Sequence, residues 1–115
     1  MRTRLLLAVC AIAALAATTL PARAASTHTV KFGEYFYKPK RLTIRSGDSV
    51  RFVNVGKIEH TVADSTKSGT IRSRVIKPRP LKHGRSQTVR LTKRATVYYV
   101  CTFHPQLMRG VIVVR

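Results

Sequence analysis

The sequence predicts an all-β protein that folds as one small domain. After residue 24, apolar and polar residues alternate in short stretches that recur roughly every eight to twelve positions, which is typical of β-sandwiches. The same part of the chain shows no apolar face with the period of a helix. Its 91 residues (115 − 24) suffice for one hydrophobic core and not for two domains.

Each expected strand places its apolar side chains on one face by a two-residue period. These positions are Val30 and Phe32; Leu42 and Ile44; Val50, Phe52 and Asn54; Val89 and Leu91; and Val97, Tyr99 and Cys101. Ser46-Gly47-Asp48 forms a turn between two strands, and residues 111–114 make the last strand.

The stretch from Ser65 to Gly84 breaks this pattern. It carries six Lys or Arg residues together with Pro78 and Pro80, and proline is excluded from the centre of a sheet. We expect a basic connection between the sheets, in which Ile71, Val75 and Ile76 attach one part to the core as an edge strand.

The first 24 residues have the pattern of a signal peptide. Arg2 and Arg4 precede an apolar run, and Ala22-Arg23-Ala24 matches the small-x-small pattern before a cleavage site. The run is shorter than the roughly 20 residues that span a bilayer. We expect cleavage after Ala24 and export to the periplasm or the cell exterior; an uncleaved anchor and cleavage after Ala25 are the alternatives.

Charge and cysteine content narrow the function. Removal of residues 1–24 leaves 19 Lys and Arg against four carboxylates, a formal charge of 19 − 4 = +15. It also leaves Cys101 as the only cysteine, so no internal disulfide is possible. A lone thiol in an exported protein is buried and inert, joined to a partner, or bound to a metal.

The residues around Cys101 favour the metal. Cys101, His104 and Met108 lie within eight residues, so that one loop can surround a single ion. One Cys, two His and a weak axial Met form the ligand set that suits copper in both oxidation states. His60 provides the second imidazole, at a position that the strand pattern places on the same face as Val62.

These motifs resemble those of the cupredoxins, and most closely amicyanin and its plastocyanin-like relatives. The resemblance includes residues 50–54, His60-Thr61-Val62, residues 99–105 and Met108-Arg109-Gly110, and it extends over nearly all of residues 25–115. It implies a Greek-key β-sandwich with one mononuclear type 1 copper ion at one end, and electron transfer between redox proteins.

The resemblance also implies a role for each residue of the site. His60, His104 and Cys101 would bind the copper, and Met108 would be its axial ligand. Asn54 would connect the two ligand loops by hydrogen bonds near Thr102, without touching the metal. One feature departs from the relatives: three residues separate His104 from Met108, where amicyanin has two and plastocyanin four. The spacing of the axial ligand therefore differs from that in both relatives. We still expect Met108 in this role, because it stands directly before Arg109-Gly110, as the axial residue of the family does.

The resulting hypothesis is an exported blue-copper protein that shuttles single electrons. The alternative is a copper carrier or scavenger that delivers the metal itself. An enzyme would need an open coordination position or a second metal cluster, and the sequence has neither extra His pairs nor a carboxylate cluster. We therefore predict that the chain is not an enzyme.

The positive charge points to acidic partners. We expect a monomer that meets redox proteins through an acidic docking surface of the partner, and that also associates with an anionic cell envelope. Specific nucleic-acid binding is not expected, because export separates the chain from nucleic acid and no aromatic residues alternate with the basic ones to stack on bases.

Overall fold

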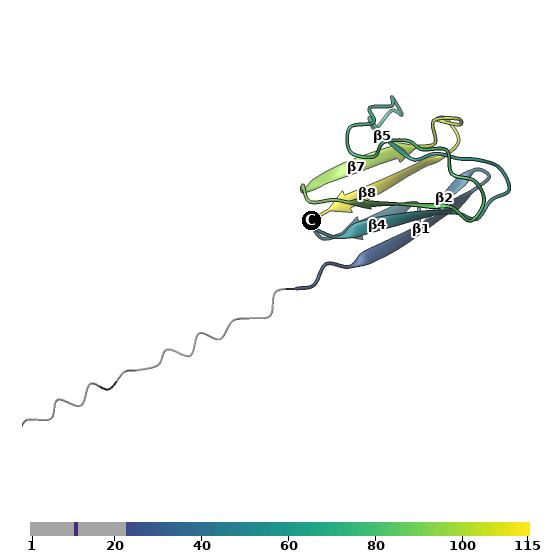
Figure 1. Cartoon of the computed structure of the whole chain (residues 1–115). Coiled ribbons are helices and arrows are strands. Elements are labelled where there is room, and N and C mark those ends of the chain that lie inside the picture. Colours follow the sequence, from purple (N-terminus) through teal and green to yellow (C-terminus); the bar gives the residue numbers. More distant parts are fainter. Residues whose placement is uncertain (1–10, 12–22) are drawn as a thin grey trace, which may run out of the picture.

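Two four-stranded sheets pack face to face in the computed structural model, which describes residues 11 and 23–115 (Figure 1). The first sheet has the order β2-β1-β4-β6 and the second β3-β8-β7-β5. The strands are β1 (Thr27–Gly33), β2 (Phe36–Lys38), β3 (Arg41–Ile44), β4 (Ser49–Asn54), β5 (Ala63–Ser65), β6 (Ser86–Arg90), β7 (Ala95–Val100) and β8 (Arg109–Val114). The all-β sandwich predicted from the sequence is confirmed.

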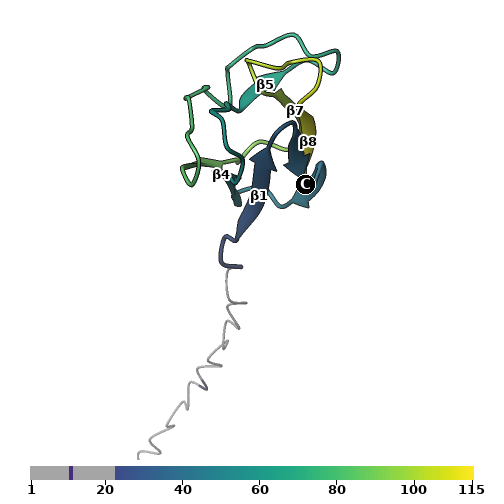
Figure 2. The same ribbon diagram turned by 90° about the vertical axis from the view of Figure 1, so that its right-hand side faces the viewer.

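The sheets mix parallel and antiparallel pairs, and this arrangement fixes which strand ends meet. β1 runs parallel to β4 and β3 parallel to β8, whereas β4–β6, β7–β8 and β5–β7 are antiparallel. Figure 2 shows the two layers from the side. One end of the sandwich consequently holds the C-terminal ends of β1, β4 and β7 and the loop from β7 to β8. The predicted ligands are found at this end.

The core follows the predicted alternation. In β4, Val50, Phe52 and Asn54 are buried and Arg51 is exposed. The buried apolar cluster contains Val30, Phe32, Tyr37, Ile44, Val50, Phe52, Val62, Ile76, Leu81, Leu91, Tyr99, Cys101, Met108, Ile112 and Val114. Because Cys101 and Met108 belong to it, the predicted metal site is continuous with the core.

The basic connection after β5 differs from the prediction in one respect. It contains no strand between residues 66 and 85, and its regular pairing is limited to the single bridges Ser65–Ile71 and His60–Leu81. Ile76 is fully buried, but Ile71 and Val75 are exposed. The carboxylate of Asp64 anchors the connection by accepting hydrogen bonds from the backbone N–H groups of Val75 (2.8 Å) and Ile76 (2.7 Å). The expected edge strand is thus replaced by isolated backbone bridges and by bonds to the Asp64 side chain.

The predicted signal peptide lies outside the described residues except for residue 11 and the segment 23–24. In the part of the chain that the structure describes, no helix is long and apolar enough to cross a membrane.

Candidate metal centre

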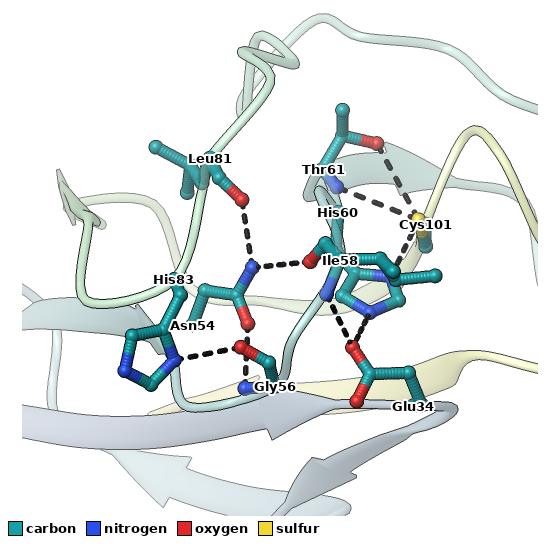
Figure 3. Close-up of polar contacts among 9 residues, drawn as sticks. All are labelled: Glu34, Asn54, Gly56, Ile58, His60, Thr61, Leu81, His83 and Cys101. Carbon is teal, nitrogen blue, oxygen red and sulfur yellow. Dashed lines mark hydrogen bonds and ion pairs between the residues drawn. The ribbon is translucent and has the colours of Figure 1, made fainter.

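His60 and Cys101 come together at the end of the sandwich although 41 positions separate them. His60 lies between β4 and β5, in a segment held to Leu81 by two backbone hydrogen bonds, and Cys101 directly follows β7. Both side chains are completely buried. The Nδ1 atom of His60 lies 3.8 Å from the Sγ atom of Cys101 (Figure 3).

Glu34 determines which nitrogen of His60 faces the sulfur. Its Oε1 atom lies 3.0 Å from Nε2 of His60 and accepts a hydrogen bond from the backbone N–H of Ile58 at 2.9 Å. The backbone bonds from Ile58 and Lys57, and then the bond from His60, lower the pKa of Glu34 to about 2. An ionised carboxylate only accepts hydrogen bonds, so Nε2 carries the proton and Nδ1 presents its lone pair to Cys101.

Gly56 makes room for this carboxylate. A Cβ atom at Gly56 would collide with the carboxyl group of Glu34. The backbone N–H of Gly56 donates to Oδ1 of Asn54 at 2.8 Å, which holds the loop in place (Figure 3). The sequence analysis missed Glu34, because nothing local in the sequence marks its contact with His60; the contact depends on where the turn from β1 to β2 lies.

Thr61 contacts the sulfur of Cys101 and joins the segment that carries His60 to the loop that begins at Cys101. Its backbone N–H points at Sγ of Cys101 at 3.4 Å, and its Oγ1 atom lies 3.8 Å from the same sulfur. Oγ1 also accepts a hydrogen bond from the backbone N–H of Thr102 at 2.8 Å and lies 2.7 Å from Oγ1 of Thr102. Hydrogen bonds to a thiolate stabilise its charge and fix its direction.

Asn54 has different partners from those predicted. It is fully buried, and its Nδ2 atom donates to the carbonyl oxygens of Ile58 (2.8 Å) and Leu81 (2.7 Å). It therefore links the backbone just before His60 to that of Leu81 (Figure 3). The prediction that it bonds near Thr102 is wrong, because Thr61 already occupies that position and makes those bonds.

The loop from Cys101 to Met108 is closed by its own backbone. His104 N–H donates to the carbonyl of Cys101 (3.1 Å), Met108 N–H to that of His104 (2.9 Å), and Cys101 N–H to that of Met108 (3.1 Å). The three residues between His104 and Met108 are thus accommodated as one turn with a bond from residue i+4 to residue i. Met108 is fully buried in the same cluster as Cys101.

His104 lies at the surface side of this group. Its half-buried ring is edge-on to Tyr35, with centroids 4.6 Å apart, and its centroid is 5.7 Å from that of His60. Within residues 23–115, no three His, Cys, Asp or Glu side chains are gathered closely enough to form a metal-binding group. The fold nevertheless brings the four predicted residues to one end of the sandwich. His60 and Cys101 are in direct contact, and His104 packs against Tyr35.

Arg109 joins the ligand loop to the loop that contains Ser68 by side-chain hydrogen bonds. Its Nε atom donates to the carbonyl of Pro105 (2.8 Å), and Nη2 bonds both Oε1 of Gln106 (2.9 Å) and the carbonyl of Ser68 (3.0 Å). Sequence reasoning did not identify this role. A basic residue next to Met108 is compatible with many functions, and the partner Ser68 comes from a distant loop.

The donor set fits a copper ion. A cysteine binds a metal ion as the thiolate and releases its proton to solvent, and a soft thiolate together with imidazoles selects copper or zinc. The addition of a buried thioether favours copper. A β-sandwich with these residues at one end defines a cupredoxin.

The comparisons agree with this class. Residues 24–115 match the family of copper binding proteins described as the plastocyanin/azurin family, and the chain belongs to this family. The family carries one type 1 copper ion and transfers electrons, so the predicted cofactor and the general function, a blue-copper electron-transfer protein, are confirmed. Relatives of the amicyanin and plastocyanin type are typically periplasmic or extracellular.

Solved structures show the same fold. A purple cupredoxin from Nitrosopumilus maritimus is 23% identical, with a TM-score of 0.70 over 76% of this chain and 99% of that one. A reduced mutant of amicyanin is 27% identical, with a TM-score of 0.66 over 77% and 82%. A comparison with curated protein sequences finds no match.

One similar structure corrects the sequence analysis. A copper-containing nitrite reductase from Thermus scotoductus SA-01 is 25% identical with a TM-score of 0.66, and the match covers 84% of this chain but 24% of the reductase. The prediction that the chain is not an enzyme is therefore wrong as an exclusion. Most cupredoxins carry electrons, but a domain of similar fold also forms part of a larger enzyme.

Proposed function

We propose that this chain is an exported, single-electron shuttle whose type 1 copper is bound by His60, Cys101, His104 and Met108. The observation that carries the proposal is the buried pair of His60 and Cys101, with Nδ1 3.8 Å from Sγ. Copper supplies the one-electron couple when it is bound there. The protein supplies a rigid surround, so that little moves when the electron arrives.

The rigidity has identifiable sources. Glu34 holds the far nitrogen of His60, Thr61 holds the sulfur, and the loop from Cys101 to Met108 is closed by three backbone bonds. These contacts limit rearrangement between the two oxidation states, which favours rapid transfer.

The route for the electron is the surface near His104. Phe103 and Leu107 on the ligand loop are 51% and 67% exposed, and Tyr35 and Ile58 on adjacent loops are also exposed. Small apolar surfaces of this kind suit brief encounters between redox proteins. The surrounding charge favours an acidic partner: of the Lys and Arg side chains in the described residues, Arg23 alone forms an ion pair.

The copper spectrum tests the proposal. Cu(II) added to the purified protein should produce an intense thiolate-to-copper absorption band, and Cys101→Ser should abolish it. Thr88→Ser, on the exposed face of β6, is the control and should leave the band unchanged. A colourless copper complex of the unmodified protein would refute the ligand assignment.

The shuttle and the carrier differ in what leaves the protein. After repeated cycles of reduction and reoxidation in the presence of a copper chelator, a shuttle keeps its blue absorption. Stepwise loss of copper from the reduced form to the chelator would instead support the carrier.

A further inference from the structure

A shallow cavity lined by three basic side chains lies beside the segment that carries His60. It has a volume of about 450 Å³ and is lined by Arg79, Pro80, Leu81, Lys82, Arg85 and Ser86. The side chains of Arg79, Lys82 and Arg85 are exposed. Within residues 23–115, none of the three has a carboxylate within ion-pair distance.

Local backbone structure holds these cations near one another. Lys82–Arg85 is a tight turn, closed by the bond from Arg85 N–H to the carbonyl of Lys82 at 3.0 Å. Gly84 has φ of 78°, which permits this geometry. The turn places Lys82 and Arg85 side by side, and Pro80 restricts the backbone that carries Arg79.

The cavity is also fixed to the interior. Leu81 exchanges backbone hydrogen bonds with His60, and Asn54 bonds the segment at three points: its side chain reaches Leu81, and its backbone bonds both Gly84 and Arg85. His83 bonds the carbonyl of Gly56 through Nδ1 at 2.7 Å (Figure 3). A cation cluster on such a rigid backbone is more than a row of mobile surface charges, because less freedom is lost when a ligand binds.

We propose that this cavity binds a multiply charged phosphate group. Two guanidinium groups can each bond two phosphate oxygens, and the ammonium of Lys82 adds a third positive charge. Three cations without a carboxylate among them balance a di- or trivalent anion better than a single carboxylate. The volume has room for a diphosphate, and the half-buried Ser86 lies at its margin.

The test uses pyrophosphate as the probe and amide NMR shifts of the metal-free protein as the signal, repeated with Cu(I). We expect saturable one-to-one binding, with shifts in residues 79–86 and also at His60 and Asn54, whose backbones bond this segment. The triple variant Arg79→Ala, Lys82→Ala, Arg85→Ala should bind roughly tenfold or more weakly.

The matched control removes three exposed cations elsewhere: Arg41→Ala, Lys93→Ala, Arg94→Ala. It loses the same charge and should keep most of the affinity. Equal weakening in both triple variants, or shifts spread over all surface cations, would overturn the proposal, because the overall positive field would then explain the binding.

Two further probes identify the source of the phosphate. Vesicles containing phosphatidylglycerol that compete with pyrophosphate would assign the cavity to a lipid headgroup; pyrophosphate binding without vesicle binding would assign it to a soluble phosphate. A polyglutamate peptide that binds residues 79–86 more tightly than pyrophosphate would overturn the phosphate assignment. The metal-free measurement keeps this test independent of the copper proposal.

Discussion

At the scale of single residues, the site depends on hydrogen bonds to atoms that do not themselves bind metal. Glu34 holds Nε2 of His60, and Thr61 holds both the sulfur of Cys101 and the backbone of Thr102. These two residues keep the buried Nδ1 and Sγ atoms aimed at one another. Their removal should therefore affect metal binding and stability in distinguishable ways.

We predict that Glu34→Gln lowers copper affinity by roughly tenfold or more, the range seen when partners of metal-bound histidines are lost. The amide removes the charge that keeps the proton on Nε2. Competition with a chelator of known affinity measures the change. Glu59→Gln is the control, because Glu59 is an exposed carboxylate next to His60 in sequence and forms no ion pair in the described residues. Equal affinity losses in the two variants would contradict the role of Glu34.

The hydroxyl of Thr61 gives a prediction about stability. Thr61→Val keeps the shape but leaves Thr102 N–H without its acceptor, which should cost about 1–3 kcal/mol in the free energy of unfolding. Thr61→Ser keeps the hydroxyl and should be milder in its effect on the copper spectrum. Urea denaturation of the metal-free forms and absorption spectra of the loaded forms provide the two measurements. The Thr102 bond does not stabilise the fold as described if Thr61→Val has the same free energy of unfolding as the unchanged protein.

The sequence predicts some of these residues and not others, for a physical reason. Val50, Phe52 and Asn54 in β4 follow a two-residue period, which is visible in the sequence and recurs in the structure. The contact of Glu34 with His60 depends on how a turn meets a loop from another strand. Periodicity carries no information about such a meeting. The predicted partners of Asn54 came from the resemblance, which does not show that Thr61 makes the bonds to Thr102.

At the scale of elements, glycines with positive φ set the backbone geometry of several turns. Gly47, Gly69 and Gly84 all have positive φ, but an added Cβ at Gly84 would meet no atom within 4 Å. Any effect of substitution there comes from the backbone alone. The turn at Gly84 also sets the geometry of the proposed phosphate cavity.

We expect Gly84→Ala to destabilise the fold by about 1–2 kcal/mol, the cost of the left-handed region for a residue with a Cβ. Gly84→Asn should recover part of this loss, because asparagine tolerates that conformation. Thermal unfolding of the three proteins measures the order Gly, Asn, Ala. If Ala matches Gly, the turn is not held in the conformation described.

The element that the sequence predicts least well is the basic connection. Prolines and charge indicate correctly that it is no central strand, but they do not show that Asp64 replaces a strand partner for Val75 and Ile76. Apolar residues in this segment look alike in sequence. The structure separates them, with Ile76 buried and Ile71 and Val75 exposed.

At the scale of the whole molecule, three of the four carboxylates accept hydrogen bonds within the fold. Asp48 and Asp64 are buried, Glu34 is exposed, and the Lys and Arg side chains lie largely at the surface. Burial of the two aspartates leaves the surface more positive than the composition alone indicates. A carboxylate that such bonds hold ionised is also a source of pH dependence, because it links proton binding to folding.

Asp48 gives the clearest pH prediction. The guanidinium of Arg23, the backbone N–H of Ser26 and His28 hold its pKa below the ordinary value. The unfolded state therefore binds more protons in acid, so the stability from Asp48 is present above the ordinary carboxyl pKa and is lost as the pH falls below it. Asp48→Asn should lower stability at neutral pH and flatten this decline.

Urea unfolding of both proteins at several pH values from 2 to 6 checks this prediction. A chain that begins at residue 25 lacks Arg23 but keeps the bonds from Ser26, His28 and Arg45, so it should retain a weaker form of the same decline. Parallel pH curves for Asp48→Asn and the unchanged protein would show that Asp48 is not the linked group.

The two ends of the folded domain meet at one turn. Ser49 N–H bonds the carbonyl of Ser26, and Arg115 bonds both Ile44 and Ser46 through its backbone. This turn lies at the opposite end of the sandwich from the ligand loop (Figure 1). A linker at either terminus could therefore attach the domain to an electrode or to a second protein with the His104 face directed outward. Joining residue 115 to residue 26 through a short peptide would likewise allow new termini to be opened elsewhere in the chain.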